Sequence, residues 1–147
     1  MLVIADNGRP YARDKTTLFD SGVKTPMIAY WPNGIRTPSV SKSIVSSIDI
    51  SATFLDLAGA KPVKSIEGKS FSQLFAHPET TFRRYAVSER NWHDFEDHGR
   101  SIRSKRFRYI RNHYPDLPPT PSADTVYHKT WWELGRLFDA GMLNKHQ

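Results

Sequence analysis

The feature that most constrains this 147-residue chain is a short apolar run that stops abruptly at two oxygen-bearing side chains. Residues 1–5 (MLVIA) are apolar and rich in branched side chains, and Asp6, Asn7 and Gly8 follow them directly. This pattern predicts a buried strand that delivers a carboxylate and a carboxamide to its carboxyl end, where ligand sites lie in open α/β sheets. Taken alone, however, the same three residues are also an ordinary turn sequence.

Asp6 and Asn7 supply hard oxygen donors of the kind that Ca²⁺ or Mg²⁺ prefers. Gly8 lets the backbone turn sharply beside them. Ca²⁺ takes about six to eight oxygen ligands, so this pair on its own is an incomplete site.

Composition narrows the class of protein. The chain is 38% hydrophobic and 12% aromatic, which is too much for a disordered protein, so we expect a globular fold. It contains no apolar stretch of about 18 residues, and we therefore expect no membrane partner. The absence of cysteine excludes disulfides, thiolate zinc sites and a cysteine nucleophile within this chain.

The middle of the chain predicts scaffold elements. Residues 27–31 predict a second strand, and Ser47 or Asp49 is expected to cap a helix that runs to Leu57. In that helix an apolar stripe that includes Phe54 is expected to face the core. We expect Asp49 to cap the helix or pin a loop rather than to act in catalysis.

The last third of the chain predicts a small sheet and a closing helix. Residues 85–87 predict a strand, and residues 101–103 and 107–110 predict an antiparallel hairpin. Residues 114–121 include four prolines, which forbid helix and predict an extended segment. A final helix is expected over residues 130–140, closed by the glycine that follows, with an apolar face that packs on the hairpin.

Positive charge is concentrated in one part of the chain. Between Arg83 and His113 there are nine Lys or Arg residues against four Asp or Glu, a surplus of five out of the net +6. Such a region predicts an anionic partner, which is either a nucleic acid or a sulfated glycan. We expect no nucleic acid, since no RNA- or DNA-binding motif is present. A solvated basic face without a partner is the alternative.

Four side chains in this basic region are candidates for substrate binding. Glu89, Arg90, His93 and His98 are expected in the loop that follows the first of these strands. Histidine with acidic and arginine neighbours can hydrogen-bond sugar hydroxyls or donate a proton to a leaving group. Each of the four, taken alone, is also compatible with an ordinary surface residue.

Several segments together resemble formylglycine-dependent sulfatases. In that family a strand ends in Asp-Asn, a Lys or Arg precedes a turn of aromatic, acid, small residue and Gly, and a Val-basic-x-Pro segment follows, as in residues 6–26 here. Residues 45–59 (VSSIDISATFLDLAG) resemble the family's next helix, with Ala52 where proline is usual. Residues 88–93 and 103–112 resemble most the branch containing heparan N-sulfatase.

This resemblance implies the C-terminal part of an alkaline-phosphatase-like α/β fold. Residues 1–80 would hold the last strands of the large mixed sheet. Residues 81–147 would form a small antiparallel sheet with a C-terminal helix. The nucleophile motif, two further metal-binding acids and most of the central sheet would lie upstream, in an N-terminal segment that is a possible partner of this chain.

The resemblance also implies a reaction, the hydrolysis of a sulfate ester or sulfamate on a sulfated glycan. In the family a hydrated formylglycine attacks sulfur while Ca²⁺ and basic residues neutralise the oxygens. Asp6 and Asn7 would ligate one Ca²⁺, and Lys15 would hold the sulfate. The formylglycine would lie in the upstream part, so we expect the isolated chain to show no turnover. The family resemblance suggests a periplasmic, secreted or lysosomal protein.

Two other functions stay open at this point. One is a non-catalytic module that binds sulfated polysaccharide through residues 83–113. The other is a phosphate-ester hydrolase of the same superfamily, which would usually need His and Asp ligands for two zinc ions, whereas Asp6 and Asn7 suit one hard cation better.

Overall fold

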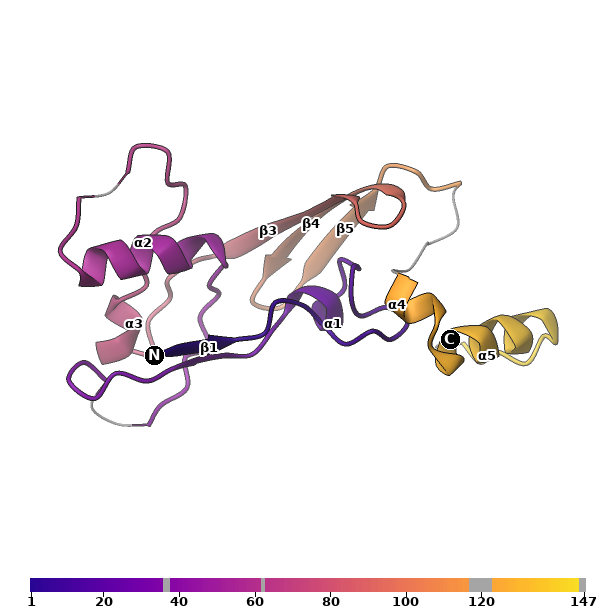
Figure 1. The fold of residues 1–147 in the computed structure, drawn as a ribbon, viewed down its shortest axis with the longest axis horizontal. Coiled ribbons are helices and arrows are strands. Elements are labelled where there is room, and N and C mark those ends of the chain that lie inside the picture. Colours follow the sequence, from indigo (N-terminus) through magenta and orange to yellow (C-terminus); the bar gives the residue numbers. More distant parts are fainter. Residues whose placement is uncertain (36–37, 62, 117–122, 146–147) are drawn as a thin grey trace. The chain divides into compact units, whose positions relative to one another are not determined.

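The computed structural model describes residues 1–35, 38–61, 63–116 and 123–145. In chain order the elements are β1 (Leu2–Ile4), α1 (Asp20–Val23), β2 (Met27–Ala29), α2 (Ile48–Leu57), α3 (Gln73–Ala76), β3 (Tyr85–Trp92), β4 (Glu96–Ser104), β5 (Arg108–Asn112), α4 (Ala123–Val126) and α5 (Lys129–Asp139) (Figure 1). The chain divides into two units. The first unit contains residues 1, 29–87 and 102–109, and the second contains residues 2–28, 88–101 and 110–147.

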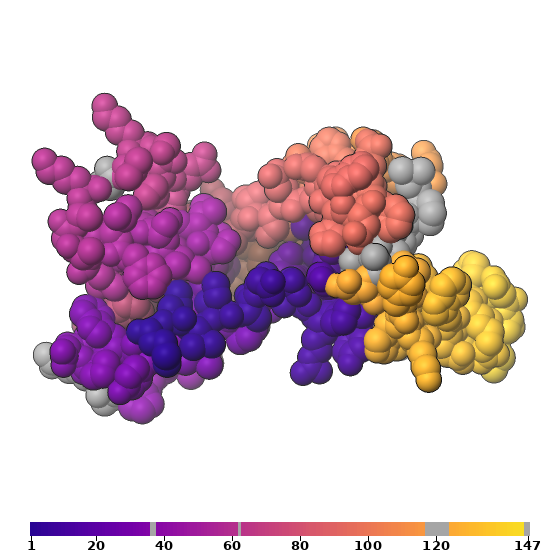
Figure 2. Space-filling model, viewed as in Figure 1, coloured from indigo at the N-terminus to yellow at the C-terminus, as the bar shows by residue number. Residues whose placement is uncertain are grey.

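Strands β1 and β2 form a two-stranded sheet. Met1 and Tyr30 exchange hydrogen bonds of 2.8 and 2.9 Å, and the Ala5 amide donates to the Pro26 carbonyl at 3.4 Å, which makes the pair antiparallel. Both predicted strands are confirmed, but the predicted burial of the first is wrong. Val3 and Ile4 are 48% and 46% exposed, and β1 (indigo) lies at the surface in Figure 2. The reason is that no third strand joins this sheet within the described residues.

Strands β3, β4 and β5 form the second sheet in that order, each beside the next in the chain (Figure 1). The predicted hairpin is confirmed, and its strands are longer than the sequence pattern indicated. Alternate residues of β3 differ in exposure: Ala86, Ser88 and Arg90 are half-buried, and the residues between them are exposed. This period of two shows that the sheet has one covered and one open face.

The predicted helix in the middle of the chain is confirmed as α2, and Gly59 just after it adopts a left-handed φ of 65° that suits a helix end. Its predicted core-facing stripe is wrong. The buried residues of α2 are Asp49 and Thr53, at 0% and 4% exposure, whereas Phe54 is 55% exposed. The helix turns this polar side inward because the Phe71 amide donates to the Thr53 hydroxyl at 3.0 Å.

Asp49 is the polar centre of the first unit. Its carboxylate accepts hydrogen bonds from the Ser46 and Lys69 amides, both at 2.9 Å, and from Nε, at 2.7 Å, and Nη2 of the Arg83 guanidinium. Burial disfavours the charge, but the bonds from Arg83, Lys69 and Ser46 outweigh it and hold the pKa of Asp49 below its ordinary value. The predicted role of Asp49 in pinning a loop is confirmed.

The apolar core of the first unit lies around α3. Phe71 and Leu74 are buried at 5% and 8% exposure. The Phe71 ring meets those of Phe75 and Phe82 edge to face, with centroids 5.9 and 6.3 Å apart.

The predicted C-terminal helix is confirmed as α5, with His128 accepting a hydrogen bond from the Thr130 amide at its start and Gly141 in a left-handed conformation after its end. The prediction that its apolar face packs on the hairpin stays a prediction, because residues 102–109 of the hairpin belong to the other unit. Helix α5 buries no residue, and Phe138 is 72% exposed. The prolines of the predicted extended segment beyond Pro115 lie outside the described residues.

Candidate functional site

The turn after β1 brings Asp6 and Asn7 to the surface of the second unit. Asp6 is exposed and Asn7 is half-buried. The Asn7 amide nitrogen donates to the Gly8 carbonyl at 2.7 Å, which leaves the side-chain oxygen as the free ligand atom. The turn needs a glycine at position 8, because a Cβ there would lie 2.2 Å from the Ser21 carbonyl oxygen. Helix α1 therefore packs directly against the turn.

These two side chains fit a hard cation chemically, because each offers one or two oxygens and neither offers sulfur or imidazole. The part of the chain that the structure describes contains no group of three or more His, Cys, Asp or Glu residues placed to hold a metal ion. The two side chains alone are therefore too few for a Ca²⁺ shell of about six to eight oxygens.

Lys15 lies in a loop that is held by its own hydrogen bonds. The Lys15 amide donates to the Arg9 carbonyl at 3.0 Å. The hydroxyls of Thr17 and Ser21 both donate to the Arg13 carbonyl at 2.8 Å. These bonds order the loop over residues 9–22, which leads into the short helix α1; the sequence pattern did not indicate this helix.

The backbone on both sides of Lys15 is strained. Arg13 and Thr16 have φ values of 67° and 64°, in the left-handed region that side chains with a Cβ rarely adopt. For a branched residue such as Thr16 this conformation costs about 1–2 kcal/mol. Strain of this kind persists only where the surroundings fix it, and it is concentrated at binding and active sites.

The Lys15 ammonium is surrounded by carboxylates. It donates a hydrogen bond to Asp124, and the Lys15 side chain is only 22% exposed. The hydrogen bond that Lys15 donates to Asp124 raises the pKa of Lys15; partial burial opposes the shift, and the charges of Asp124, Asp6 and Asp94 add to it. Asp6 and Lys15, predicted from one motif, therefore lie within electrostatic reach of each other.

The four candidates of the basic region were predicted to share one loop, but the structure does not place them in one. Glu89 and Arg90 are part of β3, and His98 is part of β4; His93 alone lies in the turn. The prediction ended the strand too early, since β3 continues to Trp92. Neighbouring residues of a strand face opposite sides of a sheet, so Glu89 and Arg90 point apart.

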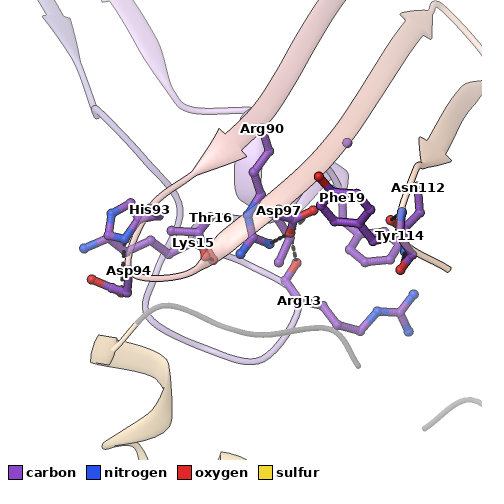
Figure 3. Close-up of polar contacts among 12 residues, drawn as sticks. Arg13, Lys15, Thr16, Phe19, Arg90, His93, Asp94, Asp97, Asn112 and Tyr114 are labelled. Atoms are coloured by element: carbon purple, nitrogen blue, oxygen red, sulfur yellow. Dashed lines mark hydrogen bonds and ion pairs between the residues drawn. The ribbon is translucent and has the colours of Figure 1, made fainter. Parts of the chain in front are cut away.

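Arg90 lies on the face of the sheet that carries the Lys15 loop. It pairs with Asp97 at 2.9 Å, and both side chains are largely buried (Figure 3). Gly99 lies two residues beyond Asp97 and so on the same face, and a Cβ there would lie 2.8 Å from Leu18. Leu18 belongs to the Lys15 loop, so the loop covers this face.

Glu89 and His98 lie on the opposite face. Glu89 is 3.5 Å from Arg100, and His98 stacks on His113 with ring centroids 4.0 Å apart. Burial, together with the charges of His98, Arg111 and Arg100, lowers the pKa of His113. This face is therefore a separate cluster from the surroundings of Lys15.

His93 lies at the tip of the hairpin, with Nδ1 3.0 Å from the Asp94 carboxylate (Figure 3). Asp94 acts on the pKa of Lys15, which links this tip to the Lys15 loop. The sequence did not single out Asp94, Asp97 or Asp124. Asp94 adjoins a candidate histidine, but Asp124 is separated from Lys15 by 109 residues and had no local signal.

Residues 11–117 match the family described as N-sulphoglucosamine sulphohydrolase, C-terminal. The chain belongs to this sulfatase family. The match includes Lys15, the basic hairpin and all four candidates of that region. It confirms the predicted family and the predicted C-terminal part of a sulfatase.

Curated relatives agree with this assignment. The chain is 34% identical over 146 residues to an ulvan-active sulfatase of Formosa agariphila, a match that covers 97% of this chain and 24% of that protein. It is 42% identical over 53 residues to the N-acetylgalactosamine-6-sulfatase of Mus musculus, covering 36% of this chain and 10% of that protein. The chain thus spans about a quarter, or less, of the length of these relatives.

A solved structure shares the fold. The protein BT4656, in complex with its substrate D-glucosamine-2-N,6-O-disulfate, matches with a TM-score of 0.61 and 22% identity, over 84% of this chain and 29% of that one. The predicted α/β fold is confirmed. Among the described residues, no helix is both long and apolar enough to span a membrane.

Proposed function

We propose that this chain is the part of a sulfated-glycan sulfatase that supplies Lys15 to hold the sulfate and Asp6 with Asn7 to a Ca²⁺ site. The observation that carries the proposal is that Asp6 lies within electrostatic reach of Lys15. The loop that contains Lys15 is also strained on both sides of this lysine. The predicted division into residues 1–80 and 81–147 stays a prediction.

Asp6 and Asn7 would ligate the cation through their side-chain oxygens. When bound, Ca²⁺ neutralises negative charge on the oxygens of the transferred sulfate group. The local hydrogen bond from Asn7 to the Gly8 carbonyl holds the amide so that its oxygen faces away from the backbone. The formylglycine nucleophile would come from residues outside this chain, which has no cysteine.

Lys15 would grip a sulfate oxygen in the ground state and in the transition state. Its ammonium is a compact donor of three hydrogen bonds, and lysine is protonated at neutral pH. In the structure the Asp124 carboxylate binds this ammonium, in the role that a sulfate oxygen would take. A sulfate therefore has to displace Asp124, and because that pair is partly exposed the exchange costs little.

Arg90 and His93 are the hairpin residues that this proposal assigns to the sugar. Arg90 is on the face covered by the Lys15 loop, and His93 adjoins Asp94, whose charge reaches Lys15. Glu89 and His98 lie on the other face and stay predictions. The names of the relatives support a sulfated sugar as substrate, and the choice between N- and O-sulfate is left to the assay.

A chimera tests this proposal. The matched 146-residue part of the ulvan-active sulfatase is replaced by this chain, and sulfate released from ulvan is measured by ion chromatography. We expect the folded chimera to release sulfate, whereas the isolated chain releases none. A chimera that folds, as judged by circular dichroism, and binds Ca²⁺ without releasing sulfate from ulvan or from N- and O-sulfated glucosamine would contradict the proposal.

A further inference from the structure

A groove in the first unit has a lining rich in positive charge. Segments 40–44, 78–84 and 104–107 enclose a space of about 610 Å³. The lining includes five cations, Lys42, Arg83, Arg84, Lys105 and Arg106, and one acid, Glu79. The Lys15 loop contributes nothing to it.

The walls of this groove are held by hydrogen bonds between backbone and side chains. Ile44 and Arg83 form an antiparallel bridge, and the Phe82 amide donates to the Ser43 hydroxyl at 2.7 Å. The turn from β4 to β5 is closed by the Ser104 amide, which donates to the Phe107 carbonyl at 2.8 Å. The groove is therefore a feature of the folded unit.

The cations that line the groove differ from other arginines of the basic region in their partners, with Arg83 as the exception. Arg83, Arg90 and Arg100 face carboxylates, in the pairs described above. In contrast, Lys42, Arg84, Lys105 and Arg106 are exposed, and within the described part of the chain they form no ion pair. The groove thus gathers four cations that have no carboxylate partner among the described residues.

We propose that this groove binds a sulfated polysaccharide chain, at a site separate from Lys15. Its four uncompensated cations can each meet a sulfate group, with release of counterions from the polymer. Phe107 is 69% exposed, with the Arg106 guanidinium 5.3 Å above its ring, and offers an apolar face for a sugar. The choice of glycan over nucleic acid rests on the proposed sulfatase function.

The consequence is a polymer-binding surface formed by the first unit alone, with no contribution from Lys15. Loss of the groove should weaken binding of the polymer and leave binding of a monosaccharide unchanged.

The test uses the 147-residue chain with heparin, its desulfated form and a single-stranded DNA oligomer as probes. The triple variant K42Q/R84Q/K105Q removes three groove cations. The control K61Q/K64Q/K129Q removes the same charge from exposed lysines that do not line the groove. Affinity is measured by calorimetry at several salt concentrations, and circular dichroism confirms that each variant is folded.

We expect the groove variant to lose at least tenfold in heparin affinity, with a salt slope lower by about two to three, and the control to change less than threefold. Equal losses in the two variants, equal binding of desulfated heparin, or no binding of heparin would overturn the proposal. DNA binding that is as tight as heparin and equally groove-dependent would assign the groove to nucleic acid instead.

A Lys15→Gln variant separates this inference from the proposed function. It should retain the heparin affinity of the parent chain, because Lys15 does not line the groove. If Lys15→Gln lowers heparin affinity as much as the groove variant does, the two sites are not separate and this inference fails. If instead the chimera releases no sulfate while groove-dependent binding of heparin persists, the proposed sulfatase function alone fails.

Discussion

Each unit contains an ion pair between an aspartate and a basic residue, and the two pairs differ in burial and in the number of hydrogen bonds that the aspartate accepts. Asp49 is fully buried, and its carboxylate is saturated by Arg83 and two backbone amides. Asp124 is half-exposed, with a side chain at 53%, and bonds Lys15 through one carboxylate oxygen. Both pairs join residues far apart in the chain, but they differ in how readily water or a ligand can replace one member.

The comparison teaches how to tell a structural pair from one that a ligand can open. Breaking a buried pair leaves a charge without solvent or partner, so the Asp49 pair holds α2 to the start of β3. An exposed pair is worth little, since water and ions compete for both members. The proposed exchange of Asp124 for a sulfate oxygen at Lys15 fits an exposed pair, whereas the buried Arg83–Asp49 pair does not suit such an exchange.

The largest effect on stability is expected for Asp49→Ala. This change leaves the Arg83 guanidinium and two amides without their acceptor in a buried position, and should lower the free energy of unfolding by about 3–5 kcal/mol. Urea denaturation followed by circular dichroism measures it. The control is Asp56→Ala, which removes an exposed carboxylate bonded by Ser70 and Ser72. Comparable losses in the two variants would contradict the contrast.

The same pair predicts a dependence of stability on pH. The pKa of Asp49 is lowered by folding, so its contribution is fully present above its unfolded pKa of about 3.9 and is lost as pH falls through the folded pKa. When the pH is lowered from about 5 through about 4, the free energy of unfolding of the wild type should therefore fall by more than that of Asp49→Asn. Parallel curves for the two proteins would show that Asp49 does not carry the effect.

A smaller effect is expected when the exposed pair is opened. Asp124→Ala removes the carboxylate that competes for Lys15, so affinity for inorganic sulfate should rise roughly two- to fivefold. Calorimetric titration measures this affinity. Glu133→Ala opens another exposed pair, with Arg136, and should leave sulfate affinity unchanged. A fall in affinity for Asp124→Ala would indicate that Asp124 assists Lys15 and does not compete with the anion.

The smallest effect is expected at the strained backbone beside Lys15. Thr16→Gly relieves a left-handed φ of 64° but loses the hydrogen bond from its hydroxyl to the Lys15 carbonyl. The net change should be a gain in stability of at most about 1 kcal/mol. Thermal unfolding measures it. A clear loss of stability would mean that the hydroxyl bond outweighs the strain.

The sequence predicted local elements better than their packing. Strands β1 and β2, helix α2 with Gly59 and helix α5 with Gly141 follow from local patterns of apolar residues and end signals. The burial of these elements was predicted less well. Helix α2 turns Asp49 inward because of partners twenty and thirty-four residues away, which no local pattern contains.

The candidate site shows the same limit. Asp6, Asn7 and Lys15 belong to one short motif, so a resemblance to sulfatases was enough to select them. The division of the hairpin candidates between two faces depended on how far β3 extends, which alternation alone did not fix. Asp124 approaches Lys15 only through the fold, so this pair was visible only in the structure.

The most direct test of the account is sulfate release by the chimera with Lys15→Gln, compared with Lys24→Gln. Both changes remove one lysine charge from the same family motif, but Lys24 follows α1 and is exposed. If Lys15 holds the sulfate, Lys15→Gln should lower the rate by about 100-fold or more, the loss typical for removal of one charge-stabilising donor, and Lys24→Gln should change it less than about threefold. Equal rates for the two variants would contradict the role of Lys15.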